Sequence, residues 1–227
     1  MRLALLLAIV LTAFIPALAQ QPAAPVLPGL PLTFQWRNNP ADWSVKDGAL
    51  TIRAGEKTDW FISPIDAKIS ATSPVMLFPA ARDFSLSAKV TVDFRAQWDA
   101  GVLAVYADEK NWVKFCFEKT VEQKPSIVSV VTRVLSDDST AVPIEGNSVY
   151  LKIAKSGQAI FLYYSTDAAN SSRPRKWTVV RAFSLGAAGQ PLQIGFSAQS
   201  PVGSGSTTTF TDIQYKPTAV ANFWAGE

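Results

Sequence analysis

The chain has 227 residues, a formal net charge of +3, one cysteine and no histidine. The missing histidine excludes Ser-His-Asp hydrolysis, Cys-His proteolysis and histidine-ligated metal sites, and a single cysteine makes neither an intrachain disulfide nor a four-thiolate zinc site. Acid–base chemistry is therefore left to carboxylates, lysine and tyrosine. A charge this close to neutral, without Lys/Arg runs, leaves no electrostatic footprint for nucleic acid.

The first nineteen residues are typical of an export signal. Arg2 supplies the positive n-region, residues 3–15 form an uncharged apolar stretch, and Ala17-Leu18-Ala19 is a small-x-small cleavage site. The stretch is too short for a membrane span, and no cysteine follows the cleavage site to carry a lipid. We therefore expect a secreted or periplasmic protein that does not span the membrane, with an uncleaved N-terminal anchor as the alternative.

Three zones follow the predicted signal. Residues 20–31 carry four prolines and no charge, which predicts an extended spacer. Residues 32–217 show short strand patterns without a repeat or a convincing helical period, so we expect one domain of ordinary size there. Residues 218–227 form a short C-terminal tail.

Strand patterns are frequent and separated by turn signals. Residues 43–53 alternate about Asp47-Gly48, and residues 150–165 alternate about Ser156-Gly157, which predicts two tight hairpins. Further alternating segments predict strands at 84–94, 101–107, 111–118, 126–135, 176–183, 193–198 and 207–215. Roughly a dozen strands without crossover helices indicate an all-β fold, an antiparallel two-sheet β-sandwich.

The segment 111–118 has the most distinctive polar face. Alternation places Trp112, Lys114, Cys116 and Glu118 on one side of the strand. We expect the strand to pair with 126–135, so that Arg133 could meet Glu118 across the sheet. An exposed indole beside charges is a usual way to bind amphipathic molecules, and an ordinary solvated sheet face is the alternative.

The run from 97 to 140 resembles the core of the DUF1349, or regulation-of-enolase-like, family. The matching residues are Asp99-Ala100-Gly101, Asp108, Trp112/Lys114/Glu118, Ser129 to Thr132 and Ser136-Asp137. Looser similarity extends over most of residues 33–216. In two places the chain departs from the family pattern, with Asp138 in the place of a tryptophan and Trp98 before Asp99. The resemblance implies a concanavalin A-like jelly roll, a fold whose relatives hold a sugar chain on a concave sheet.

The laminarinase-like members of that fold carry E-x-D-x-x-E on one strand, which places paired carboxylates at the separation a retaining mechanism needs. This chain lacks the pattern. With Lys114 and Arg133 beside it, Glu118 is expected to stay ionised with a lowered pKa, which suits binding better than acid catalysis. A second carboxylate from Asp99 or Asp59 leaves a glycoside hydrolase or lyase as an alternative.

Other candidates have plainer interpretations. Trp60 either lies at the groove rim beside Asp59 or belongs to the core, and we favour the core. Asp137-Asp138 has too few oxygens for calcium and is expected in a turn. Cys116 is expected to be a small buried thiol rather than a reactive one.

The leading prediction is that the protein binds an oligo- or polysaccharide on its concave face. We expect this binding to need no metal and no cofactor. A sugar would stack on Trp112, and also on Trp60, while polar side chains contact its hydroxyl groups. The candidate polar residues are Lys114, Glu118, Arg133, Asp59 and Asp99. The alternatives are the hydrolase or lyase and an envelope protein-interaction module, for which we expect a buried Trp112 and an apolar patch that includes Phe223 and Trp224.

Overall fold

The computed structural model describes residues 27, 29–30, 34–169 and 174–227. This part of the chain contains sixteen strands and no helix, so no helix there is long and apolar enough to cross a membrane. The predicted export signal and most of the predicted spacer lie outside the described residues. Two residues from the predicted spacer, Leu27 and Leu30, are buried in the main core.

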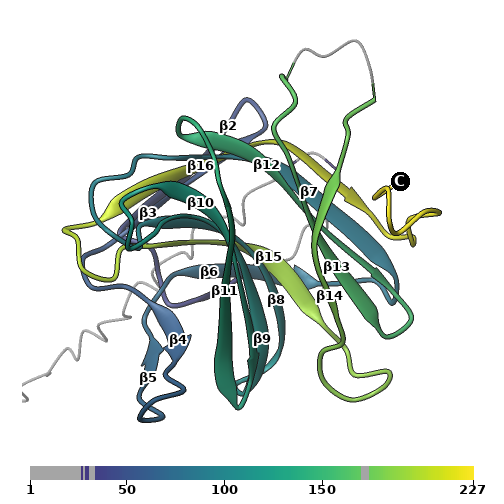
Figure 1. The fold of residues 1–227 in the computed structure, drawn as a ribbon, viewed down its shortest axis with the longest axis horizontal. Coiled ribbons are helices and arrows are strands. Elements are labelled where there is room, and N and C mark those ends of the chain that lie inside the picture. The colour runs from purple at the N-terminus through teal and green to yellow at the C-terminus, as the bar shows by residue number, and fades with distance from the viewer. Residues whose placement is uncertain (1–26, 28, 31–33, 170–173) are drawn as a thin grey trace, which may run out of the picture.

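Two antiparallel sheets of seven strands each form the sandwich, which confirms the predicted fold (Figure 1). Sheet A contains, in spatial order, β1 (Gln35–Arg37), β6 (Val75–Pro79), β15 (Gln193–Gln199), β8 (Ala100–Asp108), β9 (Asn111–Lys119), β10 (Pro125–Arg133) and β11 (Leu135–Pro143). Sheet B contains β14 (Thr178–Phe183), β13 (Ala159–Ser165), β12 (Ser148–Ser156), β7 (Phe84–Val92), β16 (Ser206–Lys216), β3 (Ala49–Ala54) and β2 (Asp42–Lys46). A separate hairpin consists of β4 (Trp60–Ile62) and β5 (Ile69–Ala71).

The main core lies between the sheets because alternate residues of their strands point inward. On β9, Val113, Phe115 and Phe117 belong to this core. Gly101 marks a close approach of the sheets, since a Cβ there would lie 2.5 Å from side-chain carbons of Val90 and Thr208. The period-2 pattern of the sequence therefore assigns the faces of these strands correctly.

The two predicted hairpins are present, with one difference in the second. Asp47 and Gly48 join β2 to β3 with φ angles of 51° and 76°, as a type I′ turn requires. In the second hairpin Ser156 still pairs with Ala159, so the turn residues are Gly157 and Gln158. Gly157 has a φ of 55° and comes first, which is the arrangement of a type II′ turn.

The main error of the strand assignment concerns β11. Asp137 and Asp138 were expected in a turn, but they pair with Val131 and Val130 in an edge strand. The chain reverses instead at Val134, whose φ is 70°. An edge strand has one paired neighbour and tolerates polar residues on both faces, so SDDST carries no alternating pattern by which to recognise it.

Candidate functional site

The β4–β5 hairpin covers part of the outer face of sheet A. The ring of Trp60 stacks on that of Trp112 at a centroid distance of 4.3 Å, and both belong to a second apolar cluster outside the main core. The backbone N–H of Ile62 donates a hydrogen bond of 2.9 Å to Ser136 Oγ, which ties the hairpin to β11. Trp112 is consequently only 1% exposed. The predicted exposed indole is wrong, because a segment distant in sequence covers it, whereas the assignment of Trp60 to the core is confirmed.

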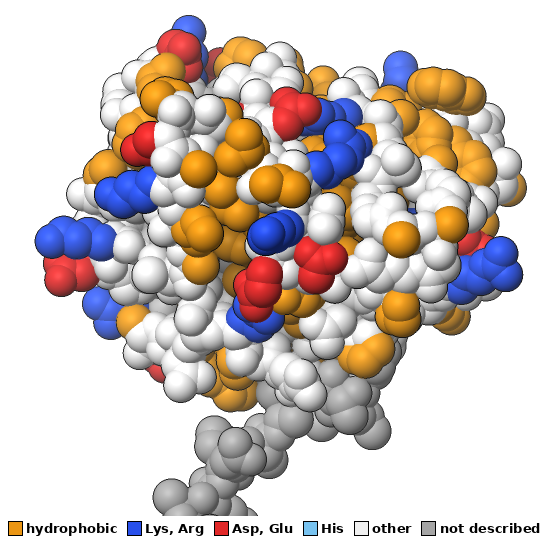
Figure 2. All heavy atoms as spheres, turned by 90° about the horizontal axis from the view of Figure 1, so that it is seen from below, with side chains coloured by type: hydrophobic (Ala, Val, Ile, Leu, Met, Phe, Trp, Pro, Cys, Tyr) orange, Lys and Arg blue, Asp and Glu red, His pale blue; other side chains and the backbone are white. Residues whose placement is uncertain are grey.

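Beside the hairpin a pocket of about 380 Å³ remains open. Its lining includes Asp59 and Phe61 from the hairpin and Lys114 and Glu118 from β9. Trp98, Asp138 and Gln199 also line it. Figure 2 views the molecule from the side on which the hairpin lies, and acidic and basic side chains lie there next to one another among hydrophobic ones.

Gln199 orders the polar floor of this pocket. Its Oε1 accepts a hydrogen bond of 2.9 Å from Lys114 Nζ, and its Nε2 donates to Glu118 Oε2 at 3.3 Å and to the Trp98 carbonyl at 3.1 Å. Lys114 Nζ also lies 3.4 Å from Asp59 Oδ1, which links β9 to the hairpin. The amide of Gln199 therefore fixes the lysine and the glutamate in one network. Sequence reasoning missed this residue, although alternation in QIGFSAQ places it on the outer face with Ser197.

Burial dominates the electrostatics of Glu118. Glu118 is 7% exposed. Burial raises the pKa of its carboxyl group to about 8, even though the Lys114 ammonium opposes the rise. The expected lowering of this pKa is wrong, because desolvation outweighs the single nearby cation. Within the described residues, Oε1 of Glu118 has no hydrogen-bond donor, so the carboxyl group presents one free oxygen to the pocket.

Lys114 is affected in the opposite sense. Burial lowers the pKa of its ammonium, but the carboxylate of Asp59, together with Glu118 and Asp138, more than compensates, so that the net pKa is raised. Lys114 therefore stays charged although it is only 3% exposed. An ammonium with three protons and two acceptors, Gln199 and Asp59, retains the capacity to donate to a ligand.

Arg133 lies on the other face of sheet A. On β10 the partner of Glu118 is Ser126, whereas Arg133 pairs with Asn111. The guanidinium of Arg133 donates to the Ser184 carbonyl at 2.8 and 3.2 Å. The predicted contact between Arg133 and Glu118 is wrong, because the odd-numbered residues of β10 face the other sheet.

Asp99 is buried and supports a loop instead of lining the pocket. Its carboxylate accepts hydrogen bonds of 2.8 Å from the backbone N–H groups of Arg95 and Ala96 and one of 2.6 Å from Ser200 Oγ. These bonds use both carboxylate oxygens of Asp99 and fix the conformation of the loop that precedes β8. Asp99 therefore does not supply the second carboxylate that the hydrolase alternative needs.

Cys116 is fully buried between Lys114 and Glu118 on β9. Burial raises the pKa of its thiol well above the ordinary value, although the Lys114 ammonium opposes this. The prediction of a small buried thiol is confirmed. A thiol in this state is neutral and inert.

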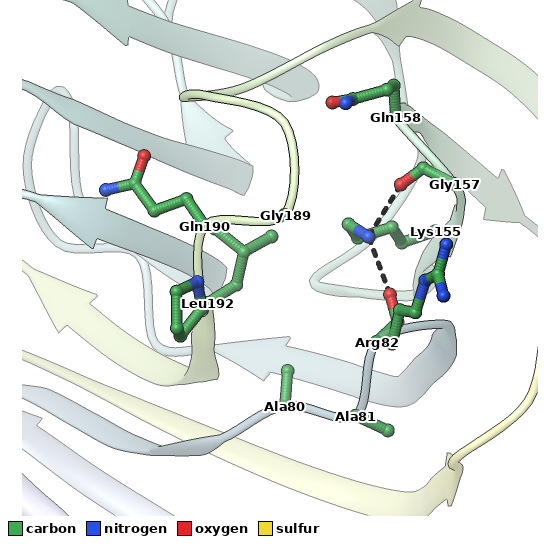
Figure 3. A pocket seen from close by; sticks show the side chains of 10 residues that line it. Ala80, Ala81, Arg82, Lys155, Gly157, Gln158, Gly189, Gln190 and Leu192 are labelled. Carbon is green, nitrogen blue, oxygen red and sulfur yellow. Dashed lines mark hydrogen bonds between the residues drawn. The ribbon is translucent and has the colours of Figure 1, made fainter.

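Larger cavities lie elsewhere on the described part of the molecule. One of about 550 Å³ lies at the end of the sandwich between Ala81, Lys155 and Leu192 (Figure 3). There the ammonium of Lys155 is already bound by the carbonyls of Arg82 and Gly157 at 2.6 and 2.7 Å (Figure 3). The described residues contain no group of three or more side chains suited to a metal ion.

Comparisons with known proteins agree with this fold. Residues 36–218 match the model of the DUF1349 family, described as a protein of unknown function. A Saccharomyces cerevisiae protein described as functionally unknown superposes with a TM-score of 0.70 at 21% identity, covering 83% of this chain and 97% of that one. No curated protein matches the chain.

Two Bacillus structures also superpose on the chain. A mutant of the GH43 protein BlXynB from Bacillus licheniformis has a TM-score of 0.60 at 21% identity, with 84% of this chain and 37% of that chain covered. A xylan β-1,4-xylosidase from Bacillus halodurans has a TM-score of 0.58 at 15% identity, with 75% and 33% covered. The chain thus spans about a third of the length of these two proteins. At these identities the likeness shows the fold.

Proposed function

The chain belongs to the DUF1349 family, and from this premise and the pocket beside the hairpin we propose that the protein binds a saccharide there. The pocket volume of about 380 Å³ falls within the range of roughly 300–1,000 Å³ that small-molecule sites occupy. A pocket of this size takes the end of a glycan better than the middle of a long chain. The ligand class is therefore an oligosaccharide, or the terminal residues of a polysaccharide.

The observation that carries the proposal is the carboxyl group of Glu118. It is desolvated, it lines the pocket, and one of its oxygens has no donor within the described residues. Among the described residues, Ser73 Oγ is the one buried polar side-chain atom without a hydrogen-bond partner, so Glu118 Oε1 is accessible from the pocket, where a ligand can take the place of water. A sugar hydroxyl is a suitable partner, because it both donates and accepts, and protonated Glu118 does the same.

The surroundings of Glu118 support the same ligand class. Lys114 offers a further donor, and Trp98, which is 38% exposed, provides an aromatic surface at the pocket. Amphipathic rings of this kind pack against the apolar faces of polar ligands. The likeness to a xylan β-1,4-xylosidase adds support from a protein that acts on a saccharide.

Calorimetric titration of the protein with a panel of neutral oligosaccharides, xylo-oligosaccharides included, tests the proposal. We expect binding that Glu118→Leu and Trp98→Ala each weaken by about tenfold or more, a change of roughly 1.4 kcal/mol. Arg133→Ala is the matched control, since Arg133 lies on the opposite face. Absence of binding across the panel, or equal affinity in all four proteins, contradicts the proposal.

A glycoside hydrolase or lyase is the second candidate, and the pKa of Glu118 favours it. With its pKa raised to about 8, Glu118 keeps its proton at neutral pH, as a general acid must. Asp59 and Asp138 line the same pocket and are the remaining choices for a second carboxylate. Release of reducing ends from the same panel, abolished by Glu118→Gln while ligand binding persists, is the expected result. Turnover that survives this substitution rules the candidate out.

The protein-interaction alternative predicts a buried Trp112, and Trp112 is buried. That alternative does not account for the desolvated Lys114 and Glu118 at an open pocket.

We also propose that the protein is exported by the segment 1–19, so that its ligands are glycans outside the cytoplasm. Cell fractionation with and without this segment tests the proposal, and retention of both forms in the cytoplasm contradicts it.

A further inference from the structure

The pocket beside the hairpin contains more carboxyl groups than cations. Asp59, Glu118 and Asp138 line it, and Lys114 is the one basic residue of its lining. The Lys114 ammonium is matched by Asp59, with 3.4 Å between Nζ and Oδ1. Asp138 therefore contributes a negative charge that the pocket leaves uncompensated, whether or not Glu118 carries its proton.

The two adjacent aspartates of β11 differ in whether a cation pairs with them. Asp137 forms an ion pair of 2.6 Å with Arg181, across to β14. Asp138 is the next residue, so its side chain lies on the opposite face of the strand, and it forms no ion pair within the described residues. Burial and the neighbouring carboxylates of Asp137 and Asp59 raise its pKa, although the Lys114 ammonium and the Ser139 backbone N–H oppose this.

Two further features of the pocket suit a cation. Glu118 is more than nine-tenths buried and presents an unpartnered oxygen. Phe61 and Trp98 add aromatic rings, whose faces attract ammonium groups. Phe61 already lies beside one such group, because Lys114 Nζ is 5.9 Å from its ring centroid. Carboxylates combined with aromatic faces form a usual environment for a bound ammonium.

We propose that the saccharide bound in this pocket carries a primary ammonium group, as an amino sugar with a free amine does, and that this group lies between Asp138 and Glu118. The inference rests on the proposed function and specifies its ligand. Acidic sugars are disfavoured, because a carboxylate or sulfate would meet like charge from Asp138. An N-acetylated sugar lacks the positive charge, so the carboxylate of Asp138 does not strengthen its binding.

Three β-1,4-linked tetrasaccharides of equal length test this inference in calorimetric titrations of the full chain: a glucosamine tetramer, its N-acetylated form and a glucose tetramer. At a mildly acidic pH that protonates the amine, we expect the glucosamine tetramer to bind about tenfold more tightly than either of the others. We expect the ratio to shrink as salt is added, because a charge pair at the rim of a pocket is screened.

Asp138→Asn is the decisive variant, and Asp137→Asn is its matched control on the other face of β11. We expect Asp138→Asn to abolish the preference for the amine, with the ratio of affinities near one, and Asp137→Asn to retain it. Thermal melting establishes that both variants are folded. A preference that persists in Asp138→Asn overturns the inference.

Failure of the inference and failure of the proposed function are distinguishable. Equal binding of the neutral and amine-bearing tetramers by the unaltered protein overturns the inference and leaves saccharide binding intact. Absence of binding to all three tetramers, and to the panel of neutral oligosaccharides, overturns both.

Discussion

The outer faces of the two sheets are covered in different ways. On sheet A the β4–β5 hairpin lies over the strands and leaves a pocket that contains Lys114 and Glu118. On sheet B the C-terminal tail lies over β13, where the ring of Phe223 stacks on that of Phe161 at a centroid distance of 5.1 Å. The Tyr163 hydroxyl donates to the Phe223 carbonyl at 2.7 Å. Both covers are packed by aromatic stacking, and the cover on sheet A adds buried side chains that carry an ammonium and a carboxyl group.

A lysine under each cover shows the consequence of this difference. Lys114 is surrounded by carboxyl groups, so its pKa is raised in spite of the burial that would lower it. Lys152 on sheet B lies 4.9 Å from the Trp177 ring centroid and donates to the Gly226 carbonyl at 2.5 Å. Burial and the Lys216 ammonium lower its pKa to about 8, which the Glu227 carboxylate opposes. Carboxylates at the site, and not burial alone, decide in which direction the pKa of a covered lysine shifts.

The largest expected effect concerns the apolar contact under the hairpin. Trp112→Ala removes a fully buried ring that stacks on Trp60, and we expect the free energy of unfolding to fall by about 3–5 kcal/mol. Urea denaturation followed by tryptophan fluorescence and circular dichroism measures this. A loss below about 1 kcal/mol would show that the hairpin is not packed on sheet A in solution.

A second prediction uses the pH dependence of stability. Glu118 ionises near its ordinary pKa of 4.5 in the unfolded chain and near 8 in the folded one. Its contribution to stability is therefore complete below pH 4.5 and is lost as the pH rises to 8. We expect the protein to lose of the order of 3 kcal/mol between about pH 5 and pH 8 through this group.

Glu118→Gln is the variant that isolates this loss, because the amide resembles the protonated carboxyl group and does not titrate. We expect the difference in unfolding free energy between variant and unaltered protein to grow in favour of the variant as the pH rises through this range. Denaturant titrations at several pH values measure it. Parallel pH profiles for the two proteins would mean that Glu118 is not desolvated.

The tail on sheet B is expected to contribute less. Phe223 is partly buried on Phe161, whereas Trp224 is 74% exposed. We expect Phe223→Ala to lower the free energy of unfolding by about 1–2 kcal/mol and Trp224→Ala by less than about 0.5 kcal/mol. Equal effects of the two substitutions in thermal or urea denaturation would contradict the docking of the tail through Phe223.

A further pH effect is expected at Lys152, and it has the opposite sign to that of Glu118. Its pKa is about 8 in the folded protein and near 10.5 when unfolded, so the folded state gains stability as the pH rises between these values. Lys152→Met removes the titrating group, and we expect the variant to lack this gain. Thermal melts from about pH 8 to about pH 10 compare the two proteins. If the variant shows the same gain in stability over this pH range, the gain comes from a group other than Lys152.

Much of the fold follows from local patterns, and the site follows from them only in part. The residues of β9 were assigned to the correct faces because alternation is a property of the strand itself. Arg133 was placed on the wrong face because a register cannot be inferred from one strand. Asp138 and Gln199 line the pocket from β11 and β15, which β10 and β8 separate from β9, so their approach to Glu118 depends on the arrangement of several strands.

The sequence by itself determined the two-sheet architecture, the type I′ hairpin at Asp47-Gly48 and the polar row that carries Lys114 and Glu118, because each depends on residues close together in the chain. Only the tertiary structure decided that Trp112 is covered, that Asp99 supports a loop and that the pKa of Glu118 is raised. The physical reason is that coverage and desolvation arise from contacts between segments far apart in sequence, and desolvation then sets the charge state of the groups inside.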